Sequence, residues 1–221
     1  MVVSEERQFQ HFPVQHFCPV ARTLEVLGER WSFLIVRDLL RAPQRFSDLQ
    51  RYLAGITPKR LTVRLRALEA AGIVAREETP GRREVWYRLT PKGGELRPVI
   101  ESLAGWGLDH AMISPPPQKT YYPEQLIGAF RTYLRRRPAP PMPIRWALDF
   151  PDGPTYALTH DGARWSVRAD DAPDATLRIA AAPFALASLL AAPREEKLRA
   201  LDALVVSGDA AEVAVLRGLV G

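Results

Sequence analysis

The chain has 221 residues, of which 47% are hydrophobic and 25% charged, with a formal net charge of +5. This composition is typical of an ordinary soluble globular protein, and the length suffices for two modest domains or one large one. Its single cysteine excludes an internal disulfide, and neither a cysteine-based zinc site nor a histidine cluster is visible. The longest apolar run, residues 179–192, is too short to span a membrane and contains Pro183. With no signal-peptide pattern at the N-terminus, we expect a cytoplasmic protein that does not enter membranes.

The first half of the chain is predicted to be mostly helical, with one hairpin near its end. Apolar periodicity and turn residues predict helices over residues 18–30, 31–40, 46–53, 57–71 and 91–113. Ser47 is a plausible cap for the third of these helices. Alternating side chains predict strands over residues 73–78 and 84–90, joined by a tip that contains Arg82 and Arg83. A basic hairpin directly after a helix pair is typical of the wing of a winged helix.

The helix over residues 57–71 carries the strongest functional signal. Thr57 can cap it, Pro58 fits its first position, and Gly72 ends it. Leucines recur at helical spacing and predict the buried side, whereas cationic and small side chains point away. A helix of this kind fits the DNA major groove. The predicted DNA-contacting residues are Arg45, Ser47, Thr57, Pro58, Lys59, Arg60, Thr62, Val63, Arg64, Arg66, Arg82 and Arg83.

The distribution of charge also indicates that a polyanion would bind the region around this helix. Residues 41–92 hold 12 Lys and Arg against 5 Asp and Glu, whereas residues 114–221 hold 13 against 12. The positive field therefore belongs to the first half of the chain. The alternative is that the basic helix is merely a solvated face.

A proline-rich break beginning at Ser114 predicts a domain boundary. We expect a DNA-binding and dimerisation domain over residues 1–113, a connector with one helix over 114–143, and a small domain over 144–221. Four short strands are predicted over residues 144–150, 155–159, 163–168 and 175–180. Helical stretches over 183–190 and 194–201, a strand over 204–206 and a helix over 209–219 follow. The predicted fold class is α+β, with a winged helix-turn-helix followed by a small α+β domain.

Several motifs of the first half resemble the HxlR-type winged-helix regulators. They include Cys18-Pro19-Val20, Gly28-Glu29-Arg30-Trp31, Arg45-Phe46-Ser47-Asp48-Leu49, Gly55-Ile56-Thr57-Pro58-Lys59 and Tyr87-Arg88-Leu89-Thr90-Pro91. The resemblance covers about residues 16–110. It implies a homodimeric transcription factor that binds a pseudo-palindromic operator of double-stranded DNA. It also implies that the N-terminal segment and the helix around Trp106 form the dimer interface.

The second half resembles the sterol-carrier-protein fold in two stretches, Ala175-Thr176-Leu177-Arg178-Ile179 and Leu204-Val205-Val206-Ser207-Gly208-Asp209. That resemblance implies a small hydrophobic effector held between sheet and helices. The side chains predicted to line its pocket are Trp146, Phe150, Leu158, Trp165, Phe184 and Leu189. The alternative is that these six side chains form the core of the domain.

Cys18 has two interpretations, because some members of the resembled family sense oxidants or electrophiles at this position. It is either a thiol sensor or a small packing residue before a proline-started helix. Nucleophile elbows, P-loops and zinc-protease motifs are absent from the sequence, so we predict no enzyme and no cofactor. The rival functions are a hydrophobic-ligand carrier that uses its N-terminal half for dimerisation, and a regulator whose second half only enlarges the dimer.

Overall fold

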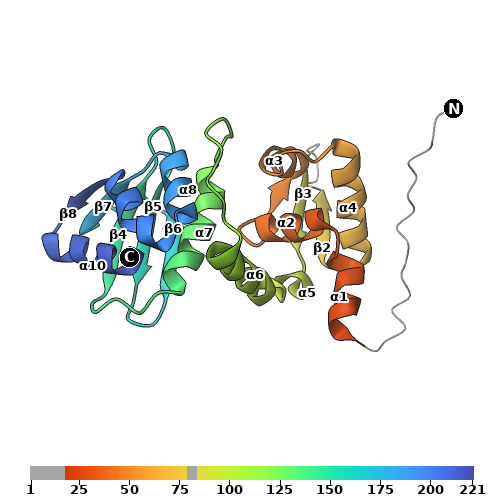
Figure 1. The fold of residues 1–221 in the computed structure, drawn as a ribbon. Coiled ribbons are helices and arrows are strands. Elements are labelled where there is room, and N and C mark those ends of the chain that lie inside the picture. Colours follow the sequence, from red (N-terminus) through yellow and green to blue (C-terminus); the bar gives the residue numbers. More distant parts are fainter. Residues whose placement is uncertain (1–17, 79–83) are drawn as a thin grey trace. The chain divides into compact units, whose positions relative to one another are not determined.

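A computed structural model describes residues 18–78 and 84–221, so the predicted wing-tip arginines, Arg82 and Arg83, lie outside the described residues. The chain divides into two compact units, one ending at Ile100 and the other beginning at Glu101 (Figure 1). Each unit has its own hydrophobic core.

The first unit alternates helices with a small antiparallel sheet. Its elements are α1 (Pro19–Leu27), α2 (Arg30–Leu39), β1 (Gln44–Arg45), α3 (Phe46–Tyr52), α4 (Pro58–Ala70), β2 (Val74–Glu78), β3 (Val85–Leu89) and α5 (Pro91–Gly94), followed by the start of α6 (Arg97–His110). Strand order in the described part of the sheet is β1-β3-β2. The β2–β3 pair runs in register from Val74 opposite Leu89 to Glu78 opposite Val85. The predicted winged helix-turn-helix is therefore confirmed.

Leucines hold α4 against the rest of this unit. Leu61, Leu65 and Leu68 are buried, as their spacing predicts, and pack with side chains of α2, α3 and the sheet. The turn between α3 and α4 passes through Gly55, whose φ of +93° suits a residue without a Cβ. Gly72, with φ +68°, ends α4 in the same left-handed region.

A buried carboxylate lies at the C-terminal end of α2 and pairs with two local arginines. The Asp38 side chain is fully buried and accepts hydrogen bonds from Arg37 Nε and Nη2 at 3.0 and 3.1 Å. Arg41 Nη1 adds a longer contact of 3.4 Å. Removing these arginines would leave the buried carboxylate without a partner and would lower the free energy of unfolding.

Two local predictions in this unit are wrong. Ser47 does not cap α3, because β1 keeps the chain extended through Arg45 and the helix already begins at Phe46. Residues 91–113 form two helices rather than one, with a break at residues 95–96. Pro98 explains the break, since in a continuous helix its ring would clash with the carbonyl of Gly94. A Thr90 side-chain cap, which accepts from Gly93 N at 3.1 Å, starts the short α5 separately.

The second unit contains the remainder of α6 and a sheet covered by helices on one face. Its further elements are α7 (Pro123–Arg135), β4 (Ile144–Asp149), β5 (Thr155–His160), β6 (Trp165–Ala169), β7 (Leu177–Ala180), α8 (Pro183–Ala191), the 3₁₀ turn η1 (Arg194–Glu196), α9 (Lys197–Asp202), β8 (Val205–Gly208) and α10 (Ala210–Val220). Within the described residues the sheet order is β6-β5-β4-β7-β8. The β4–β7 pair is parallel, and the other pairs are antiparallel.

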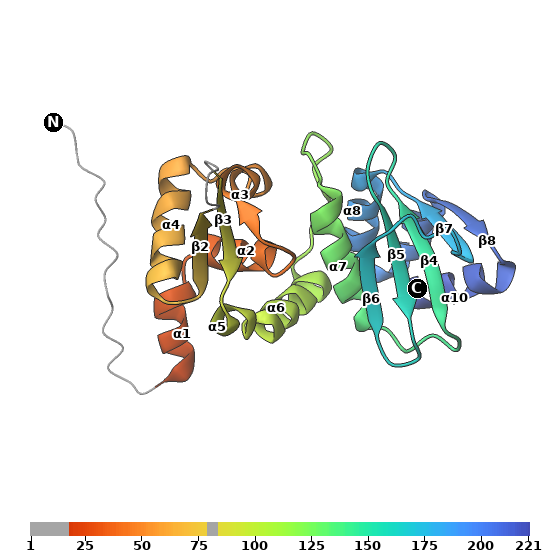
Figure 2. The same ribbon diagram turned by 180° about the vertical axis from the view of Figure 1, so that it is seen from behind.

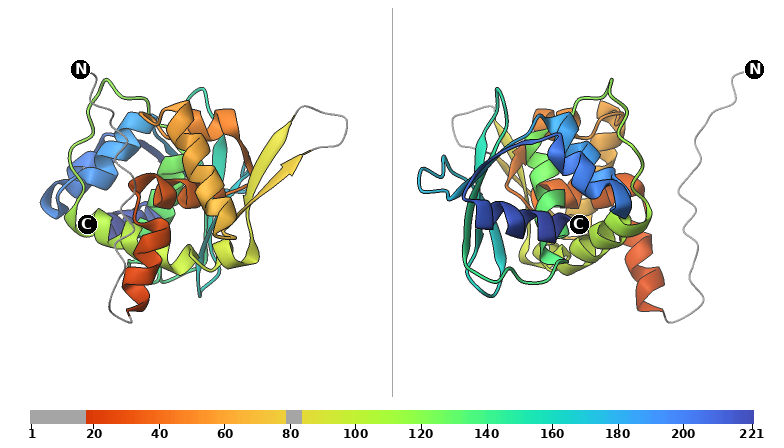
Figure 3. Two further views of the ribbon diagram at one scale, coloured as in Figure 1. Left: turned by 90° about the vertical axis from the view of Figure 1, so that its right-hand side faces the viewer. Right: turned by 60° about the vertical axis from the view of Figure 1, so that its left-hand side comes forward.

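Opposite views place α7, α8 and α10 on one face of this sheet (Figures 1 and 2). The same layering is visible from a third direction in the right panel of Figure 3. Leu126, Phe130 and Leu134 of α7 are buried in the core between the layers. The compact division falls inside α6 rather than at Ser114, because α7 and Leu108 of α6 pack with this core.

Ion pairs within the second unit link the C-terminal end of α7 to α6. Arg135 Nη1 contacts Glu101 Oε1 at 3.0 Å, and Arg136 pairs with Asp109. The guanidinium of Arg136 lies over Gly105, where an added Cβ would come within 2.8 Å of Nη1. In the described part of the chain, no helix is long and apolar enough to cross a membrane.

Candidate nucleic-acid interface

The outward face of α4 presents cations and few apolar atoms. Lys59, Arg60 and Arg66 are exposed, and Val63 retains 43% of its accessible surface. Thr62 and Arg64 are half-buried. The hydroxyl of Thr62 donates to Pro58 O at 2.9 Å, so its proton is used within the helix while its lone pairs remain acceptors. The helix thus separates a leucine side, which holds it in place, from a side able to meet an anion.

The first turn of α4 is fixed as the sequence predicts. Thr57 Oγ1 accepts a hydrogen bond from Arg60 N at 3.3 Å, and Pro58 occupies the first turn. Both residues are exposed. Ser47 is also exposed, within the first turn of α3.

The far end of α4 is held by residues that the sequence analysis missed. Lys92 Nζ donates to Ala71 O at 2.8 Å, and Thr90 Oγ1 donates to Gly72 O at 2.7 Å. These carbonyls follow the last turn of α4, where cations and donors complement the helix dipole. Gly93 allows this close approach, because a Cβ there would lie 2.2 Å from Ile73 O. The run Thr90-Pro91-Lys92-Gly93 could have predicted this arrangement. A capping residue followed by proline indicates that a helix starts directly after the second strand.

Arg45 is anchored to the base of the hairpin. Its Nη2 pairs with Glu84 Oε2 at 2.9 Å, and its guanidinium lies 4.7 Å from the centroid of the Trp86 ring. The side chain is still 44% exposed. Its predicted contact with a phosphate would therefore compete with Glu84.

Apolar side chains are exposed on α1 and on α6, each within its own unit. Val20, Leu24 and Val26 lie on α1, whereas Leu103 and Trp106 on α6 expose 52% and 58% of their surface. Cys18 is half-buried at the N-cap of α1, and its side chain makes no cap hydrogen bond.

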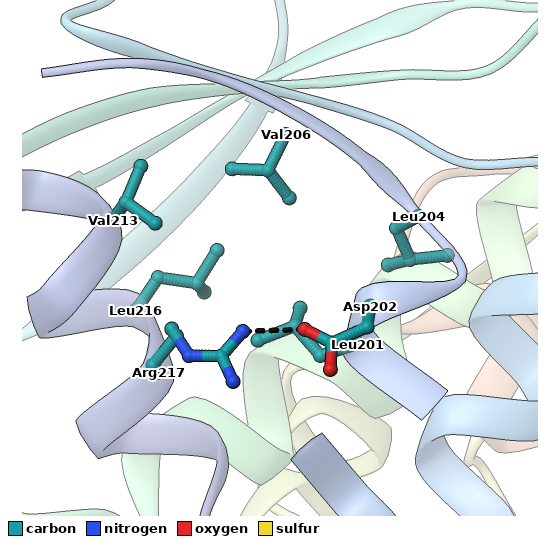
Figure 4. Close-up of a pocket in the computed structure, with 7 residues that line it drawn as sticks. All are labelled: Leu201, Asp202, Leu204, Val206, Val213, Leu216 and Arg217. Carbon is teal, nitrogen blue, oxygen red and sulfur yellow. Dashed lines mark hydrogen bonds and ion pairs between the residues drawn. The ribbon is translucent and has the colours of Figure 1, made fainter. Parts of the chain in front are cut away.

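The six predicted effector-pocket residues divide into five that are buried and one that is exposed. Trp146, Phe150, Leu158, Trp165 and Leu189 are buried in the core of the second unit. Phe184 is 41% exposed and borders a groove of about 290 Å³ together with Ser188 and Pro193. A different cavity, of about 160 Å³, lies between α9, β8 and α10 (Figure 4).

Together these features define a DNA-binding protein of the winged helix-turn-helix class, with a capped, outward-facing basic helix beside a hairpin. Residues 26–114 match the family model of the HxlR-like helix-turn-helix. The HTH-type transcriptional regulator sll1512 of Synechocystis sp. is 38% identical over 101 residues, which cover 44% of this chain and 73% of that protein. YybR of Bacillus subtilis is 36% identical over 108 residues, covering 48% and 83% respectively.

Among solved structures, the redox regulator HypR in its oxidized form is 35% identical, covering 43% of this chain and all of that chain, with a TM-score of 0.42. The curated relatives are covered over more than two thirds of their length. The chain belongs to the HxlR-like helix-turn-helix family and is a transcriptional regulator of that type.

Proposed function

We propose that this regulator is a homodimer that binds a pseudo-palindromic operator, with two copies of α4 in successive major grooves. The carrying observation is the geometry of α4, whose leucines are buried while Lys59, Arg60 and Arg66 remain exposed. Dimer symmetry would then be mirrored in the operator, and the spacing of the two helices would set the half-site spacing.

Base reading is assigned to exposed residues in the first three turns of α4. Lys59, Arg60 and Arg66 can donate to guanine edges, and Val63 can contact a thymine methyl group. Arg82 and Arg83, which the sequence predicts between the two strands and which lie outside the described residues, are assigned to phosphates, which supply affinity without sequence information. Arg45 shares that role, although its ion pair with Glu84 must open or be shared first.

The dimer interface is assigned to the apolar faces of α1 and α6. Leu24 on α1 and Leu103 and Trp106 on α6 are large side chains left exposed in a single chain. Aromatic and aliphatic groups of this kind are enriched in the cores of homodimer interfaces. We expect Trp106→Glu to give a monomer by sedimentation analysis and to weaken operator binding.

The first test is selection of genomic fragments by the purified protein, read by sequencing at moderate and high salt. A recovered inverted repeat supports the proposal and identifies the regulated genes. Recovery of random, salt-sensitive fragments alone would contradict operator reading, because phosphate contacts by themselves carry no sequence preference.

A charge-reversal test separates the regulator from a ligand carrier. The triple variant Lys59→Glu, Arg60→Glu and Arg66→Glu should lose operator binding while it keeps its circular dichroism spectrum. The matched control changes Lys119, Arg164 and Arg168 to Glu, because these cations are exposed on the second unit. An equal loss in both variants would mean that net charge, rather than α4, determines binding. No DNA affinity in the wild type would favour the carrier.

Two routes of control belong to the proposal as alternatives. In one, a small hydrophobic effector binds the second unit, and it can act only if it binds two dimer geometries with different affinity. The aliphatic cavity beside α10 supports this route. In the other, oxidation of Cys18 alters the dimer. Diamide treatment of wild type and Cys18→Ser tests that route, and equal operator binding by both would eliminate it.

A further inference from the structure

We propose that the cavity between α9, β8 and α10 binds a small monocarboxylate whose apolar body has about six carbon atoms. Its regulatory consequence rests on the effector role proposed above, but binding itself can be measured without DNA. The site is distinct from the one that the sequence predicted, because none of the six predicted pocket residues lines this cavity.

Aliphatic side chains from one short stretch of chain converge on the cavity (Figure 4). They are Leu201, Leu204, Val206, Val213 and Leu216. Val206 belongs to β8, which is an edge strand in the described sheet, and Val213 and Leu216 lie one turn apart on α10. The small valines leave space between the edge of the sheet and the helix. The recess is open to solvent on the side of Asp202 and Arg217, so its aliphatic wall can take up an apolar group while a polar group of the same ligand stays at the rim.

The volume limits the size of the occupant. The cavity measures about 160 Å³, and an apolar cavity of roughly 150 Å³ is known to hold benzene. Pockets for drug-sized ligands and cofactors usually measure ~300–1,000 Å³. A phenyl ring or a six-carbon chain therefore fits, whereas a sterol or a long acyl chain does not.

Arg217 supplies the polar end of the site. It pairs through Nη1 with Asp202 Oδ1 at the rim of the cavity, as the dashed line in Figure 4 shows. A guanidinium has five N–H donors, so one contact leaves others for a second carboxylate. It is also planar and weakly hydrated, which suits it to binding a carboxylate beside an apolar surface.

The existing ion pair presents little obstacle to a ligand. The side chains of Arg217 and Asp202 are 45% and 55% exposed, and exposed pairs of this kind contribute little to stability. A ligand carboxylate can therefore share the guanidinium or displace Asp202 from it. The ligand's apolar body would then enter the cavity past this pair.

The experiment uses the full-length protein with ¹³C-labelled valine and leucine methyl groups, titrated with benzoate and hexanoate. We expect saturable shifts at Val206, Val213 and Leu216, with weaker or no effect from benzylamine and toluene. Shifts confined to other methyl groups would overturn the assignment of the site. If benzylamine binds as tightly as benzoate or more tightly, the assignment of a carboxylate ligand is wrong. If decanoate binds clearly more tightly than hexanoate, the size limit is wrong.

Matched variants provide a second readout. Val206→Phe should fill the cavity and weaken benzoate binding at least tenfold. Val205→Phe is its control, because Val205 is the preceding residue of β8 and is 69% exposed. Arg217→Gln should weaken benzoate binding about tenfold, the loss expected for a charge-assisted hydrogen bond, whereas Arg168→Gln on β6 should not. If Val206→Phe does not fold, the wild-type methyl shifts and Arg217→Gln still decide the question.

Benzoate binding at this cavity with no change in operator affinity would separate the two proposals. In that case the binding site would stand and the effector role would fail. Absence of benzoate and hexanoate binding, with operator binding intact, would overturn the site and leave the regulator unaffected.

Discussion

Two adjacent glycines in α5 offer a test of how the end of α4 is held. At Gly93 an added Cβ would lie 2.2 Å from Ile73 O and 3.1 Å from Leu89 Cδ2, whereas at Gly94 it would meet nothing within 4 Å. Ordinary carbon–oxygen contacts are about 3.3 Å or longer. In Gly93→Ala the new Cβ and Ile73 O must therefore move apart by roughly 1 Å, which requires a shift of the backbone.

That shift falls on a junction dense in hydrogen bonds. Ile73 O accepts from Thr90 N at 3.0 Å, and Thr90 Oγ1 accepts from Gly93 N at 3.1 Å while it donates to Gly72 O at 2.7 Å. Each net hydrogen bond contributes about 1 kcal/mol. Disrupting two or three of them should lower the free energy of unfolding of the first unit by roughly 2–3 kcal/mol.

Hydrogen exchange of the α4 amides measures this effect in the full-length protein. Gly93→Ala should accelerate exchange at Leu61, Leu65 and Leu68 by about thirtyfold to a hundredfold, given tenfold per ~1.4 kcal/mol. Gly94→Ala should slow exchange slightly, because alanine is favoured over glycine in a helix by about 0.5–1 kcal/mol. Equal effects of the two variants would refute the steric argument.

Three further changes have expected outcomes. Thr57→Ala should destabilise α4 by about 1 kcal/mol, measured by hydrogen exchange, whereas Thr57→Ser should retain the cap. Asp38→Ala should cost ~1.5–3 kcal/mol in urea unfolding, because it removes charge-assisted hydrogen bonds at a buried position, against less than about 1 kcal/mol for Asp48→Ala, whose ion pair with Arg51 is more exposed. Burial and the nearby Arg137 charge lower the pKa of Lys197 to about 8. The folded protein therefore loses this proton before the unfolded chain does, and the free energy of unfolding should rise between pH 8 and 10, by up to ~3 kcal/mol. Lys197→Met should abolish that rise in urea unfolding at a series of pH values; a rise that persists would contradict it.

The sequence predicted the regular elements where local signals agree. Thr57, Pro58 and the leucine spacing predicted α4 closely, because capping, helix geometry and burial all favour the same residues. The helix after Thr90 was predicted less well, since the apolar periodicity of residues 96–108 masked the effect of Pro98. Ser47 was wrongly predicted to cap α3. The start of that helix is set by the pairing of Arg45 with Trp86, a long-range contact that the residues near α3 do not reveal.

The second unit shows a further limit of sequence reasoning. Large aromatic and aliphatic side chains, such as Trp146 and Leu158, are equally suited to a core and to a pocket, and packing placed them in the core. The observed cavity is lined by ordinary valines and leucines with no distinguishing spacing. Its existence depends on how α9, the edge strand β8 and α10 are arranged, which residue types alone do not determine.

The whole lining of that cavity lies between Leu201 and Arg217, whereas α4 ends before residue 72. The chemistry of the pocket and the chemistry of DNA reading are therefore encoded in separate, contiguous stretches of the gene. Mutation or recombination of a few codons near the C-terminus can change the shape and charge of the cavity without altering α4. If the cavity holds the proposed effector, a laboratory library limited to this stretch can change the ligand while the proposed DNA contacts of α4 stay unchanged.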